Sequence, residues 1–272
     1  MSANEWRRRI DRADELAAKY AGAAQILRFY AEIVRFQEKL YRQMRPAEAM
    51  KGAADGNPFG LPLERELGGS FAAFLSVVER SGPKALGEAA RELARQGEAS
   101  QFELLQGFWE IAFREINGSG LAEGPEDFFA RAFLQPYAAS VREKAKLEWH
   151  GPTAFVCPFC KRKPGLGVLR PLGEGSQRSL ICSFCLAEWE FRRIVCAGCG
   201  EEDPVKLPVY TAEELQHVRV EACESCKTYI KTVDLTRSAL GEPMVDEMAS
   251  VALDLWAQGR GYAKLQKNLL LL

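Results

Sequence analysis

Apolar residues recur with a helical period in the first half of the chain. They stand seven positions apart at Tyr20, Leu27, Val34 and Tyr41. A repeat of this kind places its members on one face of a helix, so we predict a single long helix here. The glycine- and proline-rich stretch 52–62 breaks the pattern and predicts a loop.

Further helices are predicted before residue 149. Residues 71–81 carry apolar positions at helical spacing after Ser70, a residue type that caps helices. The stretch 100–103 has the capping-box pattern, which predicts that another helix begins there. Pro125 suits the first turn of a last helix, and we expect Pro136 to kink or split it. The aromatic positions of these helices are expected to form a core.

The pattern changes after residue 149, where β-branched residues and turn formers become frequent. We expect short strands at 168–170, 179–181, 189–195 and 218–220. Helical spacing returns over 242–258, with Pro243 in the first turn. The predicted fold class is therefore α+β and multidomain: an all-α N-terminal domain, a β-rich region and a C-terminal helix.

The β-rich region contains all eight cysteines of the chain, arranged in four CxxC pairs. The pairs are Cys157 with Cys160, Cys182 with Cys185, Cys196 with Cys199, and Cys223 with Cys226. Two intervening residues allow a tight turn, or knuckle, to direct both sulfurs at one cation, and two knuckles complete a tetrahedral site with four cysteine ligands. Four knuckles so close together predict two metal sites.

The spacing of the pairs indicates which knuckles share a metal. Gaps of 21, 10 and 23 residues separate successive pairs. Some twenty residues suit a ribbon that folds one knuckle onto the next, whereas ten is short for that. We therefore predict that the first and second pairs form site 1 and that the third and fourth form site 2. A cross-brace, joining the first pair to the third and the second to the fourth, stays open.

These patterns divide the chain into four predicted parts. They are a helical domain over 1–149, a first rubredoxin-like or zinc-ribbon metal module over 150–190, a second over 191–241, and a C-terminal helix and tail over 242–272. Two other roles for the cysteines are disfavoured. Structural disulfides need an oxidising compartment, and no export signal is visible in the sequence. Iron–sulfur clusters commonly use C-x₂-C-x₂-C runs, which are absent from this sequence. Zinc and a single iron ion both suit a four-cysteine site.

Charge and hydropathy narrow the function classes. Lys and Arg number 36 and Asp and Glu 37, so the net charge is −1 and no strong overall field attracts nucleic acid. The tight basic cluster Lys161-Arg162-Lys163 is expected to be a solvated turn. Without an apolar run of 18 residues or a secretory pattern, we expect no membrane insertion and a cytoplasmic location. Sites with four protein ligands leave no open position for a substrate, so we do not expect hydrolytic metal catalysis.

Several motifs together resemble the FdhE family of formate dehydrogenase accessory proteins. They are the four knuckles in this order, the stretch 221–231 (EACESCKTYIK) around the fourth, and the stretch 246–254 (DEMASVALD) in the closing helix. The resemblance covers about residues 155–268. It implies a helical N-terminal domain, two rubredoxin-like modules whose eight cysteines hold two metal ions, with iron favoured over zinc, and no catalytic activity.

The resemblance also implies a partner. FdhE-type proteins act on formate dehydrogenase in the cytoplasm, so the expected partner is its catalytic subunit, with self-association left open. Residues of the two motifs are candidate partner contacts: Tyr229, Lys231, Asp246, Glu247 and Asp254. The alternative is that they lie on plain strands and a solvated helix face. Two other function classes stay open, a rubredoxin-type electron carrier and a zinc-ribbon protein that binds nucleic acid.

Overall fold

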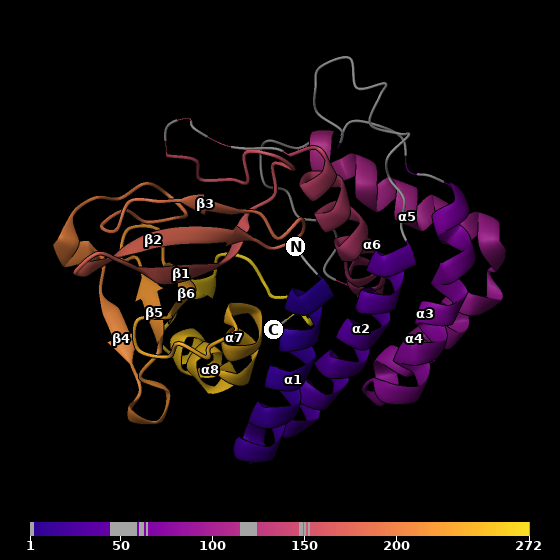
Figure 1. Cartoon of the computed structure of the whole chain (residues 1–272), viewed down its shortest axis with the longest axis horizontal. Coiled ribbons are helices and arrows are strands. Elements are labelled where there is room, and N and C mark those ends of the chain that lie inside the picture. The colour runs from indigo at the N-terminus through magenta and orange to yellow at the C-terminus, as the bar shows by residue number, and fades with distance from the viewer. Residues whose placement is uncertain are drawn as a thin grey trace.

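A computed structural model describes residues 3–43, 59, 63, 65–114, 124–146, 149, 151 and 153–271. Helices come first along the chain, a mixed sheet follows, and two short helices lie between the sheet and the N-terminal helices (Figure 1). Of the predicted loop over 52–62, all but Phe59 falls outside the described residues.

Six helices make up the described part of the N-terminal half. They are α1 (Ala3–Lys19), α2 (Ala24–Gln43), α3 (Phe71–Ser81), α4 (Lys84–Arg95), α5 (Gly97–Arg114) and α6 (Pro125–Lys144). The single long helix predicted through Tyr20 is wrong. Tyr20 has an extended backbone, with φ −112° and ψ 91°, and separates α1 from α2. Leu27 and Val34 are fully buried, so the apolar stripe is confirmed within α2.

Two predictions from local helix signals also fail. Ser100 lies inside α5, which begins at Gly97, so the capping box does not start a helix. Pro136 lies inside an unbroken α6 and neither splits nor ends it. The side chains of α6 are buried continuously from Asp127 to Val141, and this burial outweighs the hydrogen bond that the proline removes.

Aromatic rings fill the space between the helices. Phe71 and Phe74 of α3 meet Phe133 of α6, with ring centroids 4.9 and 5.8 Å apart. Phe128 of α6 stands 5.9 Å from Phe29 of α2. Offset and edge-to-face rings at such separations stabilise a core beyond the area they bury. The prediction that the aromatic stripes form the core is confirmed.

One sheet contains strands from both predicted metal modules. The strands are β1 (Pro164–Leu172), β2 (Gly175–Cys182), β3 (Glu188–Glu190), β4 (Val209–Thr211), β5 (Val218–Ala222), β6 (Thr228–Asp234) and β7 (Ala263–Lys264). Their order is β3-β2-β1-β6-β5-β4, with β7 beside β6. The neighbours are antiparallel except that β1 and β7 run parallel to β6. The parallel pairing of β1 with β6 therefore joins the two halves of the sheet.

The strand predictions are confirmed for β1, β2 and β5, whereas the predicted strand over 189–195 is confined to 188–190. Strands β4, β6 and β7 have no counterpart among the predicted strands. The module boundaries at 190 and 241 remain predictions, because pairing within one sheet does not divide it.

Two short C-terminal helices hold the sheet against the N-terminal helices. They are α7 (Pro243–Ala249) and α8 (Val251–Gly259), separated at Ser250. Helix α7 packs against α1 and α2 on one side and against β1 and β6 on the other (Figure 1). The predicted fold class is confirmed in its order of a helical region, a sheet with two cysteine groups, and C-terminal helices. Within the described residues, no helix is long and apolar enough to cross a membrane.

Candidate metal centre

The eight cysteines form two groups of four free thiols. The first group contains Cys157, Cys160, Cys182 and Cys185, and the second contains Cys196, Cys199, Cys223 and Cys226. In each group, all four sulfur atoms lie within 4.8 Å of one another. The structure thus brings the first pair to the second and the third to the fourth, and does not form the cross-brace.

The sulfur separations fit a tetrahedral metal. The Cys157–Cys185 and Cys160–Cys182 sulfurs are 3.5 and 3.4 Å apart. In the second group, the Cys196–Cys226 and Cys199–Cys223 sulfurs are each 3.7 Å apart. Four thiolates at ~2.3 Å from one metal ion stand roughly 3.8 Å apart. Each group can therefore hold a metal ion with small adjustments of its side chains.

The four knuckles share one local conformation. The residue after each second cysteine has a positive φ: 62° at Lys161, 58° at Leu186, 81° at Gly200 and 54° at Lys227. This left-handed residue turns the chain back, and the amide of each first cysteine donates to the carbonyl five residues on, at 2.8 to 2.9 Å. Non-glycine residues adopt such a φ only where the surroundings hold them there.

Backbone and hydroxyl donors approach the sulfurs. The amide of Phe184 donates to the Cys182 sulfur at 3.3 Å, and the amide of Gly198 donates to the Cys196 sulfur at 3.3 Å. Burial raises the pKa of the Cys226 thiol, but hydrogen bonds from the hydroxyl and amide of Thr228 lower this pKa to about 7. Donors of this kind stabilise the thiolate form, which is the form that binds metal.

The two groups differ in exposure. All four cysteines of the first group are fully buried. In the second group Cys196 and Cys223 are buried, Cys226 is half-buried and Cys199 is exposed. The second group is thus open to solvent on one side.

Helices α5 and α6 enclose the first group. Phe184 of the second knuckle meets Phe108 and Trp109 of α5, at centroid distances of 5.4 and 6.0 Å. The side-chain amide of Gln135 on α6 donates to the carbonyl of Ser183 at 3.3 Å. The first group therefore lies at the junction between the helices and the sheet.

Arg162 strengthens this junction and corrects a prediction. Its guanidinium lies 3.9 Å from the Phe108 ring centroid and 4.3 Å from that of Phe184, and donates to the Phe108 carbonyl at 2.8 Å. Burial lowers the pKa of Arg162 to about 10. The expected solvated turn therefore holds only for its neighbours Lys161 and Lys163, which are exposed. The charge pattern gave no sign that a ring from a distant helix and a ring from the second knuckle would cover Arg162.

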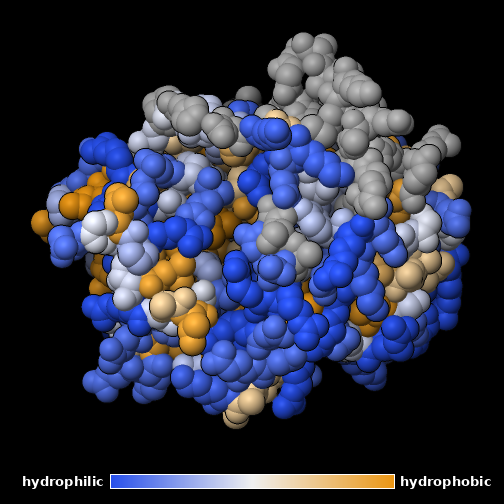
Figure 2. Space-filling model, viewed as in Figure 1, coloured by the Kyte–Doolittle hydropathy of each residue, from blue (hydrophilic) through white to orange (hydrophobic). Residues whose placement is uncertain are grey.

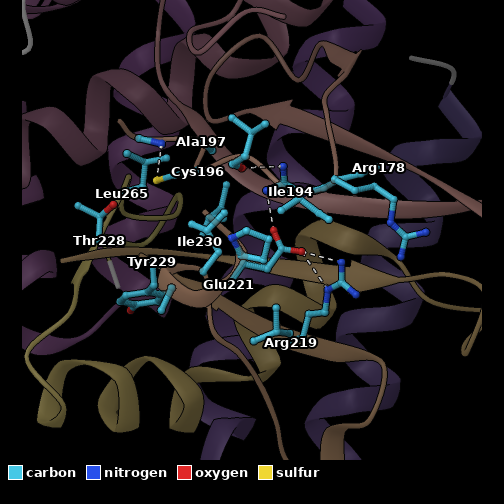
Figure 3. Close-up of a pocket in the computed structure, with 17 residues that line it drawn as sticks. Arg178, Ile194, Cys196, Ala197, Arg219, Glu221, Thr228, Tyr229, Ile230 and Leu265 are labelled. Carbon is cyan, nitrogen blue, oxygen red and sulfur yellow. Dashed lines mark hydrogen bonds and ion pairs between the residues drawn. The ribbon is translucent and has the colours of Figure 1, made fainter. Parts of the chain in front are cut away.

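A cavity of about 160 Å³ lies beside the second group, lined by Cys196 among others. Figure 3 shows Glu221 between Arg178 and Arg219 in this cavity. Arg178 donates to one carboxylate oxygen of Glu221 at 2.5 Å, and Arg219 donates to the other at 2.7 Å. Burial raises the pKa of Glu221, but the two arginines outweigh it and hold this pKa below its usual value.

The structure buries all five predicted partner contacts. Lys231 is 0% exposed, and the others are at most 2% exposed: Tyr229, Asp246, Glu247 and Asp254. Tyr229 and Lys231 lie on strand β6, as the alternative expects. Asp246, Glu247 and Asp254 are buried, so the expected solvated helix face is wrong. The reason is that α7 and α8 turn their charged side toward the sheet, where β6 presents a lysine. Contact of these five residues with a partner stays a prediction.

Four of the charges form a buried network with two positive and two negative members. Lys231 lies 3.0 Å from a Glu247 oxygen and 2.6 Å from an Asp254 oxygen. Lys264 on β7 lies 2.5 and 3.0 Å from the same two carboxylates. Burial raises the pKa of Glu247, but the two lysines outweigh it and lower this pKa to about 2. The Tyr229 hydroxyl donates to Asp254 at 2.8 Å.

Asp246 connects a different set of elements. Arg12 of α1 donates to it at 2.6 Å, and His217, which precedes β5, lies 2.8 Å from the same oxygen. Burial raises the pKa of Asp246, but hydrogen bonds from His217 and Arg12 outweigh it and hold this pKa below its usual value. Asp246 therefore ties the N-terminal helices to the sheet through α7.

Two family models match the second half of the chain. Residues 156–193 match the family described as FdhE, central domain, and residues 194–271 match FdhE, C-terminal domain. A protein named "Protein FdhE homolog" from Aquifex aeolicus is 30% identical, covering 73% of this chain and 68% of that protein. A protein of the same name from Haemophilus influenzae is 26% identical over 97% of this chain and 87% of its own length.

A solved structure is similar over the whole chain, including the helical half. It is "The crystal structure of the FdhE protein from Pseudomonas aeruginosa", which is 26% identical, with a TM-score of 0.72. The likeness covers 100% of this chain and 97% of that one. With the four knuckles, the two cysteine groups and these matches in agreement, the chain belongs to the FdhE family.

Proposed function

We propose that this protein is an accessory factor for formate dehydrogenase that binds the catalytic subunit of that enzyme in the cytoplasm and catalyses no reaction itself. The observation that carries the proposal is the pair of four-cysteine groups on one sheet, in a chain of the FdhE family. The partner is inferred from the resemblance of the sequence motifs to accessory proteins of formate dehydrogenase.

Each cysteine group is proposed to hold one metal ion, with iron favoured over zinc. The site residues would be Cys157, Cys160, Cys182 and Cys185 for the first ion, and Cys196, Cys199, Cys223 and Cys226 for the second. An iron ion in such a site can gain or lose one electron without changing its ligands. The chain itself contributes the thiolates, the amide donors at the knuckles and the shell of packed residues.

Two features support a role without catalysis. Four protein ligands complete a tetrahedral site, so no position is left for a substrate or an activated water. The first group is also fully buried, so a substrate could not approach it. A cytoplasmic location is supported by the arrangement of the eight cysteines as metal ligands, because an oxidising compartment favours disulfides instead.

An anaerobic pull-down from the native host tests the proposal. The tagged full-length chain is captured, its partners are identified by mass spectrometry, and its metal is counted in the same eluate. We expect the formate dehydrogenase catalytic subunit and about two metal ions per chain. A deletion strain with normal formate dehydrogenase activity and no second copy of the gene would contradict the proposed role.

Exposure of the second cysteine group favours one alternative, a rubredoxin-type electron carrier. Electron transfer needs a metal close to the surface, and Cys199 is exposed. Simple carriers do not need a large helical domain, which counts against this alternative. A colourless protein that contains only zinc would exclude it, because zinc does not change its oxidation state in proteins.

A further inference from the structure

The edge strand β4 has an open side. β4 is the last strand of the sheet, and its neighbour on the inner side is β5. Their register pairs Val209 with Glu221, Tyr210 with Val220, and Thr211 with Arg219. An edge strand presents a row of backbone donors and acceptors to any chain that can lie beside it.

The hydrogen-bond pattern identifies which groups face outward. The amide of Ala222 donates to the carbonyl of Pro208 at 3.0 Å, so the pair Pro208–Ala222 is a hydrogen-bonded one. Antiparallel pairs alternate, which makes Tyr210–Val220 the next hydrogen-bonded pair and turns the backbone groups of Val209 and Thr211 away from β5. Among the described residues, no backbone hydrogen bond pairs these outward groups.

Apolar hollows lie on both sides of β4. One is the cavity of about 160 Å³ beside the second cysteine group, lined by Ile194, Leu207 and Val209 among others. The other, about 950 Å³, is lined by Tyr210, Leu255 and Trp256 among others.

Hydrophobic side chains also reach the surface here. Val209 is 53% exposed and Leu255 is 66% exposed. Figure 2 shows hydrophobic side chains gathered in the region that β4, β5 and α8 occupy in Figure 1. Exposed apolar surface beside an open strand edge is typical of a site for an extended peptide.

The charge of the smaller hollow indicates what such a peptide carries. Its charged lining residues are Arg178, Arg193, Arg219 and Glu221, three positive and one negative. Glu221 is already paired with both Arg178 and Arg219. Arg193 is exposed and bonds only weakly to Ser176, at 3.3 Å. The excess positive charge favours an acidic side chain on this face of the sheet.

We propose that β4 is the docking edge for an extended segment of the client protein, which adds a strand to the sheet antiparallel or parallel to β4. This inference rests on the proposed function, since the segment belongs to the formate dehydrogenase catalytic subunit. Side chains alternate between the two faces of a strand. On one face, an apolar residue of the segment enters the larger hollow at Tyr210 and Trp256. On the other face, a second apolar residue, with an acidic neighbour, contacts Val209 and the arginines of the smaller hollow.

A proline at position 211 tests the edge directly. Thr211→Pro removes an outward amide and leaves the bonds between β4 and β5 in place, because residue 211 does not bond to β5. The matched control is Thr211→Val, which keeps that amide. Each full-length variant is used to capture the catalytic subunit of its own host. We expect about a tenfold loss of captured subunit with Thr211→Pro and less than about a twofold change with the control. Equal capture by a folded Thr211→Pro protein, with wild-type metal content and melting temperature, would overturn the proposal.

Hydrogen exchange supplies a second measurement that needs no variant. The amides of Val209 and Thr211 are expected to exchange more slowly in the complex than in the free protein, while those of β3, at the opposite edge, keep their rates. If the wild-type protein captures no catalytic subunit, the proposed function fails. If it captures the subunit and the β4 amides exchange as before, only the docking edge is wrong. Protection that appears in the free protein and grows with its concentration would assign the edge to a second copy of this chain and so overturn the proposal.

A charge reversal tests the acidic partner. Arg193→Glu is expected to weaken capture several-fold, and Arg193→Lys, which keeps the charge, to change it little. Raising the salt concentration should weaken capture by the wild-type protein and reduce the difference between wild type and Arg193→Glu. If Arg193→Glu captures the subunit as wild type does, the segment is not acidic at this position and the stated chemistry is wrong.

Discussion

The two cysteine groups have the same ligands and the same knuckles but opposite surroundings. The first is fully buried where α5, α6 and the sheet meet, with Arg162 held between Phe108 and Phe184. The second lies beside β6, β5 and β4, which we call the outer half of the sheet. Its Cys199 is exposed, and a cavity lies at its side. Burial therefore makes the first group part of the core, whereas the second is placed to meet solvent or a partner.

The outer half of the sheet is held in place by charge as well as by cysteines. β6 begins two residues after Cys226 and carries Lys231 into the network with Glu247, Lys264 and Asp254. A buried network of this kind is weak evidence for added stability but is costly to break, because a lost partner leaves a charge unpaired. Lys231 lies five residues after Cys226, so the network is close in the sequence to the second group.

The largest expected effect separates the two groups by substitution. Cys160→Ser removes a buried ligand at the junction of the helices and the sheet, and we expect the free energy of unfolding to fall by ~5 kcal/mol or more, because metal binding and folding are coupled. Cys199→Ser removes an exposed ligand and should lower it by clearly less. Urea unfolding of the metal-loaded full-length proteins measures both. Val205→Ala, at a side chain that is 87% exposed, serves as a control with a change within ~0.5 kcal/mol. Equal losses from the two cysteine variants would remove the distinction between the groups.

Metal release sharpens the same comparison without any substitution. During treatment with a chelator, we expect the second group to lose its metal at least about tenfold faster than the first, because a buried site must open before a chelator can reach it. Metal release is followed by colour or absorbance, and the newly reactive thiols are counted with a thiol reagent. Four of the eight thiols should react in a fast phase, and peptide mapping should assign them to residues 196–226. A single phase for all eight would contradict the expectation.

Breaking the charge network tests what holds the outer half. Lys231→Met leaves Lys264 alone with two buried carboxylates, so we expect the free energy of unfolding to fall by ~3–5 kcal/mol. Lys84→Met, which removes an exposed lysine near Glu88, should change it by less than ~1 kcal/mol. Thermal melting compares the two variants. We also expect Lys231→Met to speed metal release from the second group more than from the first. An equal effect on both groups would show that the network does not stabilise the outer half of the sheet in particular.

The smallest expected effect is a change in stability that appears only at acidic pH. The pKa of Glu247 is about 2 in the folded protein against an ordinary value of 4.5, so its contribution to stability is complete above pH 4.5 and is lost as the pH falls toward 2. Urea unfolding at several pH values should therefore show that the stability difference between wild type and Glu247→Gln is largest near neutral pH and shrinks below pH 4.5. Acid also releases metal from the thiolates, but it does so in both proteins. Subtracting the free energy of unfolding of one protein from that of the other removes this effect. Parallel pH profiles would show that Glu247 does not titrate as its two lysine neighbours require.

Local signals in the sequence were reliable where a short segment decides its own structure. The CxxC spacing predicted the knuckles, and Pro125 and Pro243 marked the first turns of α6 and α7. These local signals failed where contacts with residues far away in the sequence decide the structure. Pro136 is tolerated because α6 is buried nearly all round. Strand β4 has only three residues, too few to give a pattern, and the β-branched residues of β6 are mixed with the charged Lys231 and Asp234. The charged residues of β6 and α7 looked like surface positions.

By itself, the sequence determined that eight cysteines form four equivalent knuckles, and their spacing predicted the pairing that the structure displays. Only the tertiary structure decided which knuckles are buried, because burial depends on α5 and α6 folding over the first group. It also decided that Lys231 meets Glu247 and Asp254 instead of water, since β6 and the two C-terminal helices come together only in the folded chain. Identical ligand sets acquire different accessibility because accessibility is a property of neighbours that lie far apart in the sequence.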